Sequence, residues 1–166
     1  MKKQRKKYKR PLKPWDKQRL EEEEKVMKRF GLRRKRELWK AQALLRKYRR
    51  MAREAAAKKD ENLKSILIKK LYRLGILNNE NAELDDVLKL SVEDILKRRL
   101  QTIVYEKKFA NTIKQARQFI VHNKVKINGR VLSFPSYLVP REEENLIEVD
   151  SELLSKIKRS NVPTDN

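Results

Sequence analysis

The stretch NTIKQARQFIVHNKVKINGR, residues 111–130, contains the strongest local folding signals in the chain. Thr112 is followed three residues later by Gln115, which is the spacing of a capping box at the start of a helix. A helix is therefore predicted to begin at Ile113 and to end near His122. With the helix ending near His122, the residues that follow it are free to form a different element.

The predicted helix has an apolar side and a polar side. Four apolar residues at helical spacing are expected to face a core, namely Ile113, Ala116, Phe119 and Ile120. The opposite side carries Lys114, Arg117, Gln118 and His122, with only Val121 interrupting them. Because unpaired amide hydrogens add partial positive charge at a helix start, this polar side favours phosphate as a ligand.

The residues after the helix predict a β-hairpin. Polarity alternates in KVKINGR, residues 124–130, so Val125 and Ile127 are expected to face the core. Lys124 and Lys126 then share the outer face. The NG dipeptide that follows is typical of a tight hairpin turn, but the second arm alternates less clearly and its register stays open.

Two later segments are further candidate strands, SYLVP at residues 136–140 and NLIEV at residues 145–149. Helices followed by short strands define an α+β fold class. We expect a helical amino-terminal region followed by a small domain of two or three helices packed on short antiparallel strands.

The composition restricts the class of partner. The chain has 166 residues, a formal net charge of +21 and a pI near 10.2, which favour a polyanion as partner. It has no cysteine, and it has no apolar run of the ~18 to 20 residues that span a bilayer. We expect a soluble, cytoplasmic protein, although a basic start is also compatible with nuclear localisation in a eukaryote.

The positive charge is concentrated in the first third of the chain. Residues 1–60 hold 25 Lys and Arg against 8 Asp and Glu, a net charge of +17. The first segment, MKKQRKKYKRPLKP, combines like charges with two prolines and is predicted to be a disordered arm that becomes ordered on phosphate. We predict phosphate contacts at Lys6, Lys7 and Arg10; the alternative is a solubilising tail.

Two helices are predicted after the arm, over residues 16–30 and 33–58. In the second, a stripe with spacings of three and four is expected to be buried: Leu38, Ala41, Leu45, Tyr48, Ala52 and Ala55. The opposite face carries Arg36, Lys40, Arg46, Lys47, Arg50 and Arg53. We predict phosphate contact by Arg36, Lys40, Lys47, Arg50 and Arg53; a membrane surface or a calmodulin-like groove fits less well, since the apolar stripe lacks bulky anchors.

A third amphipathic helix is predicted over residues 61–74, ending at Gly75. Its expected inward residues are Leu63, Ile66, Leu67, Leu71 and Leu74. A loop with a short turn is expected over residues 78–90, and a capping box of Ser91 with Asp94 predicts another helix start.

Residues 98–139, RRLQTIVYEKKFANTIKQARQFIVHNKVKINGRVLSFPSYLV, resemble the RNA-binding domain of the S-four family, named after the fourth small-subunit ribosomal protein. The elements ARQxI, VxING and PSYLV occur in the family's order. GLRRKRELW, residues 31–39, and the helices beside it are similar to the amino-terminal part of archaeal members. The resemblance covers most of the chain and thins at both ends.

The resemblance implies a structural protein of the small ribosomal subunit. It implies binding to ribosomal RNA at a multi-helix junction, a role in nucleating subunit assembly, a place near where messenger RNA enters, and neighbouring small-subunit proteins as partners. The positions that match the RNA-facing motif are Arg99, Thr112, Lys114, Gln115, Arg117, Gln118, His122, Lys124 and Asn128, and we add Arg98 beside them.

Three positions depart from the family pattern. Lys108 and Asn123 stand where the family has glycine, and Asn111 stands where a basic residue is frequent. If the backbone at Lys108 is left-handed, the side chain carries roughly 1 kcal/mol of strain. Asparagine tolerates that conformation better, so Asn123 is expected to adopt it more easily.

The predicted division of the chain is a disordered arm at 1–15, a helical region at 16–97, an RNA-binding domain at 98–150 and a tail at 151–166. No cofactor, metal or catalytic site is expected. The chain has a single histidine and no cysteine that could join it in a metal site, and its sequence shows no Gly-rich phosphate-binding loop. For His122 itself, RNA contact and an ordinary helix-end cap both remain open.

Three functions remain open at this point. The first is a structural ribosomal RNA binder, and the second is an RNA-modifying or tRNA-charging enzyme that carries the same domain as an accessory. The third is a general nucleic-acid-compacting protein. The chain length leaves little room for a further catalytic domain, which disfavours the second.

Overall fold

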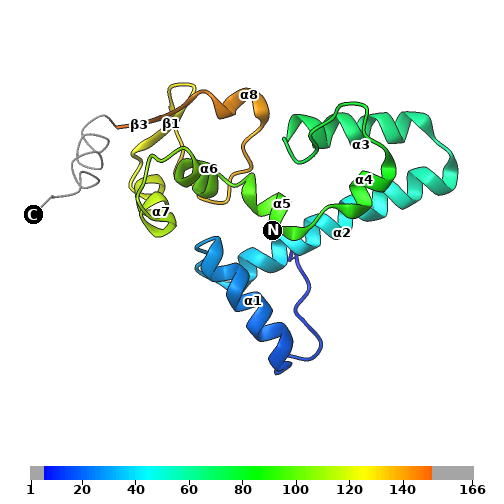
Figure 1. Cartoon of the computed structure of the whole chain (residues 1–166), viewed down its shortest axis with the longest axis horizontal. Helices are drawn as coiled ribbons and strands as arrows, with labels where there is room; N and C mark the ends of the chain where they lie inside the picture. The colour runs from blue at the N-terminus through cyan, green and yellow to red at the C-terminus, as the bar shows by residue number, and fades with distance from the viewer. Residues whose placement is uncertain (1–5, 151–166) are drawn as a thin grey trace, which may run out of the picture. The chain divides into compact units, whose positions relative to one another are not determined.

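The computed structural model describes residues 6–150 of the chain (Figure 1). The chain divides between Leu96 and Lys97 into two compact units. The first is helical, and the second combines helices with a three-stranded antiparallel sheet. The expected α+β class is confirmed, while the tail at 151–166 and residues 1–5 lie outside the described part.

The first unit is organised on a long helix. Helix α1 (Lys17–Arg29) follows the N-cap Asp16, whose side chain accepts a hydrogen bond from the Arg19 amide, and α2 (Lys35–Lys58) follows it. The buried residues of α2 are Leu38, Ala41, Leu45, Tyr48, Ala52 and Ala55, the whole predicted stripe. Periodicity alone placed this helix because one face is apolar throughout.

Helix α3 (Glu61–Arg73) packs against α2, and its inward face differs from the predicted one. Leu67, Ile68 and Leu71 are buried, whereas Leu63 is 39% and Ile66 is 59% exposed. The buried arc is rotated towards Ile68, away from Ile66, because apolar residues flank Leu67 on both sides and only the partner helix selects between them.

Two six-residue helices complete the first unit, α4 (Leu84–Lys89) and α5 (Val92–Lys97). Helix α4 replaces the predicted turn and packs against α2, as Figure 1 shows. The predicted capping box at the start of α5 is present: the Ser91 amide donates to Asp94 at 2.9 Å, and the Asp94 amide donates to the Ser91 hydroxyl at 3.4 Å. Helix α4 also begins with a capping box, formed by Glu83 and Asp86, so local side-chain bonds cap the start of both helices.

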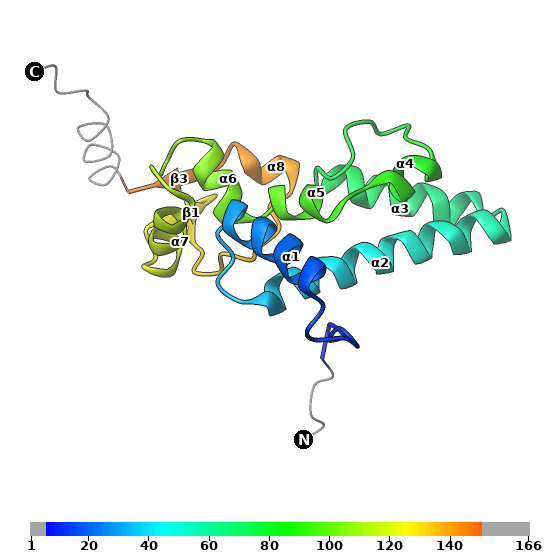
Figure 2. The same cartoon turned by 60° about the horizontal axis from the view of Figure 1, so that its bottom comes forward.

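The arm residues 6–14 have no helix or strand and contact the first two helices (Figure 2). The Tyr8 and Trp39 rings lie 5.9 Å apart between centroids. The Arg19 guanidinium donates to the carbonyl oxygens of Lys13 at 2.7 Å and Pro14 at 3.0 Å. Disorder of the arm in the free protein stays a prediction, but these contacts give residues 6–14 a place to dock.

The second unit packs α6 (Leu100–Glu106) and α7 (Ile113–Val121) on a small sheet. The strands are β1 (Val125–Ile127), β2 (Arg130–Val131) and β3 (Ile147–Val149), in the order β2-β1-β3. A single turn of helix, α8 (Arg141–Glu144), precedes β3.

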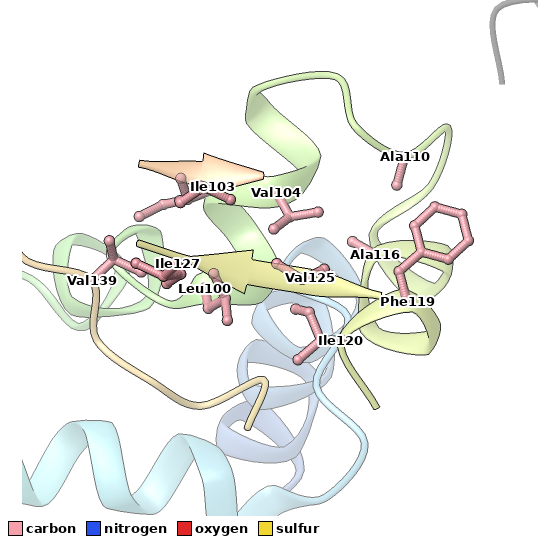
Figure 3. Close-up of a cluster of buried hydrophobic side chains, with 11 residues drawn as sticks. Leu100, Ile103, Val104, Ala110, Ala116, Phe119, Ile120, Val125, Ile127 and Val139 are labelled. Atoms are coloured by element: carbon pink, nitrogen blue, oxygen red, sulfur yellow. The ribbon is translucent and has the colours of Figure 1, made fainter. Parts of the chain in front are cut away.

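The core of the second unit lies between these helices and β1 (Figure 3). It includes Leu100, Ile103, Val104, Ala116, Phe119, Ile120, Val125 and Ile127. The expected inward residues of α7 are buried except Ile113, which is partly exposed at the helix start. Val125 and Ile127 point inward while Lys126 is exposed, as the alternation predicted.

The hairpin has a two-residue loop, which settles the register of the second arm that the sequence did not determine. Ile127 pairs with Arg130, and the backbone at Asn128 and Gly129 has φ of 50° and 74°. Positive φ at both positions is the conformation that an Asn-Gly turn supplies at low cost.

One predicted strand is absent from the described part of the chain. SYLVP forms no strand, only an isolated bridge between Leu138 and Arg99, whereas most of NLIEV forms β3. Tyr137 O and Val139 N instead bond the backbone at Leu100 and Arg98. The segment has strand-like composition, but it is used to anchor the start of α6.

Candidate nucleic-acid interface

Helix α7 and the hairpin after it carry most of the predicted site residues. Lys114, Gln118 and His122 are exposed, and His122 is the C-cap of the helix. Thr112 and Gln115 build the helix start: the Thr112 hydroxyl accepts from the Gln115 amide at 3.2 Å, and Gln115 Oε1 accepts from the Asn111 amide at 2.8 Å. These two side chains cap the start of the helix that carries the exposed polar face.

Arg117 is partly buried and is held by a residue that sequence reasoning missed. Its Nη1 donates to Gln101 Oε1 at 3.3 Å, and Gln101 Nε2 donates to the carbonyl of Ile113 at 3.0 Å. Gln101 is fully buried on α6. A polar residue inside an apolar helix segment was the available signal, since buried amides need partners.

The hairpin contributes exposed polar groups beside α7. Lys124 is exposed, and its ammonium lies 3.1 Å from the Asp150 carboxylate. Asn128 is exposed at the tip of the turn, and Lys126 and Arg130 are exposed on the strands. Three cations and one carboxamide are therefore exposed on or beside the hairpin, whose strand β1 is paired on both sides.

Arg98 and Arg99 lie in the interior of the second unit. Arg98 is 14% exposed, pairs with Glu144 at 2.7 Å and donates to the Val139 carbonyl at 2.8 Å. Arg99 is buried at the N-cap of α6. The Arg98 side chain ties α8 and Val139 to the start of α6, and the Arg99 backbone forms a bridge with Leu138, so we keep both out of the proposed contact surface.

The acidic segment at 142–144 is partly built into the fold. Besides its ion pair with Arg98, Glu144 accepts a hydrogen bond at its carbonyl oxygen from the Lys107 ammonium. Glu143 accepts a hydrogen bond from the Tyr137 hydroxyl at 2.8 Å. Burial, and then this hydrogen bond, raise the pKa of Tyr137 above its ordinary value. Only Glu142 of the three is exposed.

Lys108 and Asn123 have the left-handed backbone that the glycines of the family pattern would favour. Both have φ of 59°. The sequence left open whether Lys108 adopts this conformation, and the structure shows that it does. Lys108 therefore carries the strain of a non-glycine residue in this region.

The first unit contributes a second group of exposed cations. Arg36, Lys40, Lys47, Arg50 and Arg53 are all exposed along α2, and Lys6, Lys7 and Arg10 are exposed in the arm. Arg50 lies 3.4 Å from Glu54, both of them exposed, so this pair is weak and competes little with phosphate. The predicted cationic face is confirmed as an exposed face, and its contact with RNA stays a prediction.

Residues 6–150 show neither a metal-ion site nor a membrane-spanning helix. That part of the chain holds no group of three His, Asp or Glu side chains placed to bind a metal ion. No helix within it is long and apolar enough to cross a membrane.

Comparison with known proteins agrees with this geometry. The S4 domain family matches residues 98–145. The chain is 51% identical over 150 residues to small ribosomal subunit protein uS4 of Nanoarchaeum equitans, covering 87% of this chain and 83% of that one. It is 53% identical to the protein of the same name from Korarchaeum cryptofilum, with 89% and 90% covered, and 51% identical to that of Ignicoccus hospitalis, with 87% and 89% covered.

Proposed function

The chain belongs to the uS4 family of small ribosomal subunit proteins, and from that premise we propose that it is a structural, non-enzymatic component of the small subunit that binds ribosomal RNA. The observation that carries the proposal is the α7–hairpin surface, where Lys114, Arg117, Gln118, Lys124 and Asn128 project from anchored elements. The protein then acts in the cytoplasm with the ribosome.

The chemistry of this surface suits folded RNA. Arg117 supplies a planar fork for phosphate, and lysines supply point charges. Carboxamides can donate and accept at 2′-hydroxyl groups, which distinguish RNA from DNA. If on the order of 10 phosphates are neutralised, the logarithm of the binding constant should fall with the logarithm of salt concentration with a slope of roughly −7 to −9.

The finer parts of the proposal rest on the family resemblance. The RNA target is a multi-helix junction, the protein nucleates assembly of the subunit body, and its place is near where messenger RNA enters. Neighbouring small-subunit proteins are its other partners. Two exposed acids, Glu142 on α8 and Glu148 on β3, would suit a basic neighbour.

A competition assay separates this proposal from the alternatives. The full chain is titrated at moderate salt with a ribosomal junction RNA, a transfer RNA and duplex DNA. We expect the junction RNA to bind most tightly. Equal affinity for all three would favour a general nucleic-acid-compacting protein, and preference for transfer RNA would favour an accessory domain of an enzyme.

Matched variants locate the surface. Lys114→Ala removes an exposed lysine of α7, and Lys69→Ala removes an exposed lysine of α3. The first should weaken junction binding and reduce the salt slope by about 1, while the second should change neither. Equal effects of the two variants would contradict the proposed surface.

A further inference from the structure

The arm and the first two helices enclose a cleft of ≈ 800 Å³ in the first unit. Its lining includes Arg10, Arg34 and Arg36 together with Trp39, Leu20 and Pro14. One wall is therefore the arm, and the others are the start of α1, the connection to α2 and the first turns of α2. Figure 2 shows the arm leading into the start of α1.

A buried carboxylate holds the walls together. Glu23 is 4% exposed, and three side chains converge on it: Arg19 at 3.1 Å, Trp39 Nε1 at 3.1 Å and Lys35 at 3.3 Å. Arg19 also grips the arm through its bonds to the Lys13 and Pro14 carbonyls. Glu23 thus links the arm to both helices, which gives the cleft a defined shape without a ligand.

Within residues 6–150, the remaining cations of the cleft have no recorded side-chain contact that stabilises the fold. Arg10, Arg34 and Arg36 are exposed, and within residues 6–150 the structure records no ion pair or hydrogen bond for their guanidinium groups. By contrast, Arg19 and Lys35 are occupied by Glu23. Three guanidinium forks without an acid beside them favour a ligand with closely spaced phosphates.

The apolar residues that line the cleft further restrict the class of ligand that it can bind. Trp39, Leu20 and Pro14 form an apolar surface on which the flat faces of unpaired bases can stack. The bases of a duplex are stacked on one another inside the double helix, so they cannot reach this surface. Proteins that hold single strands combine a cationic groove with aromatic groups in this way. We infer that this cleft binds an unpaired segment of RNA, with Arg10, Arg34 and Arg36 on its phosphates and Glu23 as the positioning residue of the cleft.

This inference rests on the proposed function and can fail separately from it. Trp39 provides the probe, because the chain has two tryptophans and the other, Trp15, is outside the cleft lining and highly exposed. In the full chain carrying Trp15→Phe, the fluorescence of Trp39 is followed on titration with a short single-stranded oligouridine. A blunt-ended, fully paired RNA stem without a loop, of equal charge, is titrated in parallel.

We expect the single strand to change the Trp39 signal and the paired stem to leave it nearly unchanged. Arg34→Ala with Arg36→Ala should weaken the single-strand response by at least ~10-fold, since two phosphate contacts are lost. The matched control is Lys69→Ala with Lys70→Ala on α3, which removes the same charge from exposed positions elsewhere in the unit and should have a smaller effect.

The positioning role of Glu23 has its own measurement. Glu23→Gln keeps an acceptor but removes the charge that gathers Arg19 and Lys35, so trypsin should cleave the arm faster while the helical circular dichroism is retained. The single-strand response should weaken in the same variant. Equal responses to paired and unpaired RNA, or an arginine double variant no weaker than the lysine control, would overturn the inference even if junction binding still depends on Lys114.

Discussion

Replacing Gln101 with leucine should weaken RNA binding without touching the RNA-facing surface. Leucine has a similar volume, but it removes the acceptor for Arg117 at 3.3 Å and the donor to the Ile113 carbonyl at 3.0 Å. A hydrogen bond to a charged group contributes about 1.5–3 kcal/mol and a neutral one about 0.5–1.5 kcal/mol. Since Arg117 is only partly buried and water can replace its bond, we expect the free energy of unfolding to fall by about 2 kcal/mol.

The effect on RNA follows from the loss of the bond by which Gln101 positions Arg117. Truncating Arg117 to alanine should cost about 1–3 kcal/mol of binding free energy, and removing its bond to Gln101 should cost a part of that. If Gln101 acts through Arg117, the double variant should bind no more weakly than Arg117→Ala alone. The assay is a double-mutant cycle on junction-RNA affinity, with thermal unfolding measured for each variant.

Gln101→Glu distinguishes positioning from general support of the fold. It keeps an acceptor for Arg117 but loses the donor to Ile113, so RNA affinity should stay near that of the original chain while stability falls. The reasoning is refuted if the losses of Gln101→Leu and Arg117→Ala simply add, or if Gln101→Glu loses RNA affinity in proportion to its stability.

Three further predictions concern stability. Lys108→Gly should raise the free energy of unfolding by about 1 kcal/mol by relieving the left-handed backbone, measured by urea unfolding; a destabilised variant would contradict this. Ile120→Ala should lower it by about 2–5 kcal/mol, whereas Val121→Ala, at an exposed neighbouring position, should change it by less than about 0.5 kcal/mol. Because the pKa of Tyr137 is raised from 10.0 in the folded chain, its contribution is complete below pH 10 and is lost as pH rises through the folded value. The original chain should therefore lose stability above pH 10 more steeply than Tyr137→Phe, and parallel curves would exclude this cause.

Local signals predicted the parts of the fold that depend on neighbours in sequence. The α2 stripe, the cap of α7 and the Asn-Gly turn each need only a few adjacent residues, and each was found as expected. The α3 face was predicted wrongly because apolar residues lie on both sides of it, and only the partner helix decides which side is buried.

Partners distant in sequence also decide which way the arginines of the candidate site point. Arg98 turns inward because Glu144 and the Val139 carbonyl lie beside it, more than 40 residues away. No periodic pattern reports such a pair. The same holds for the link between Gln101 and Arg117, which joins two helices whose packing the sequence did not specify.

The small size of the sheet has a consequence for the protein before it meets its RNA. Strand β2 at one edge is two residues long and β3 at the other is three, while β1 is paired on both sides within residues 6–150. Exposed edges promote aggregation when they are long and flat enough to template another chain. Edges this short offer few backbone groups to a second copy, and the net charge of +21 makes the molecules repel one another, so both features oppose edge-to-edge association before RNA is bound.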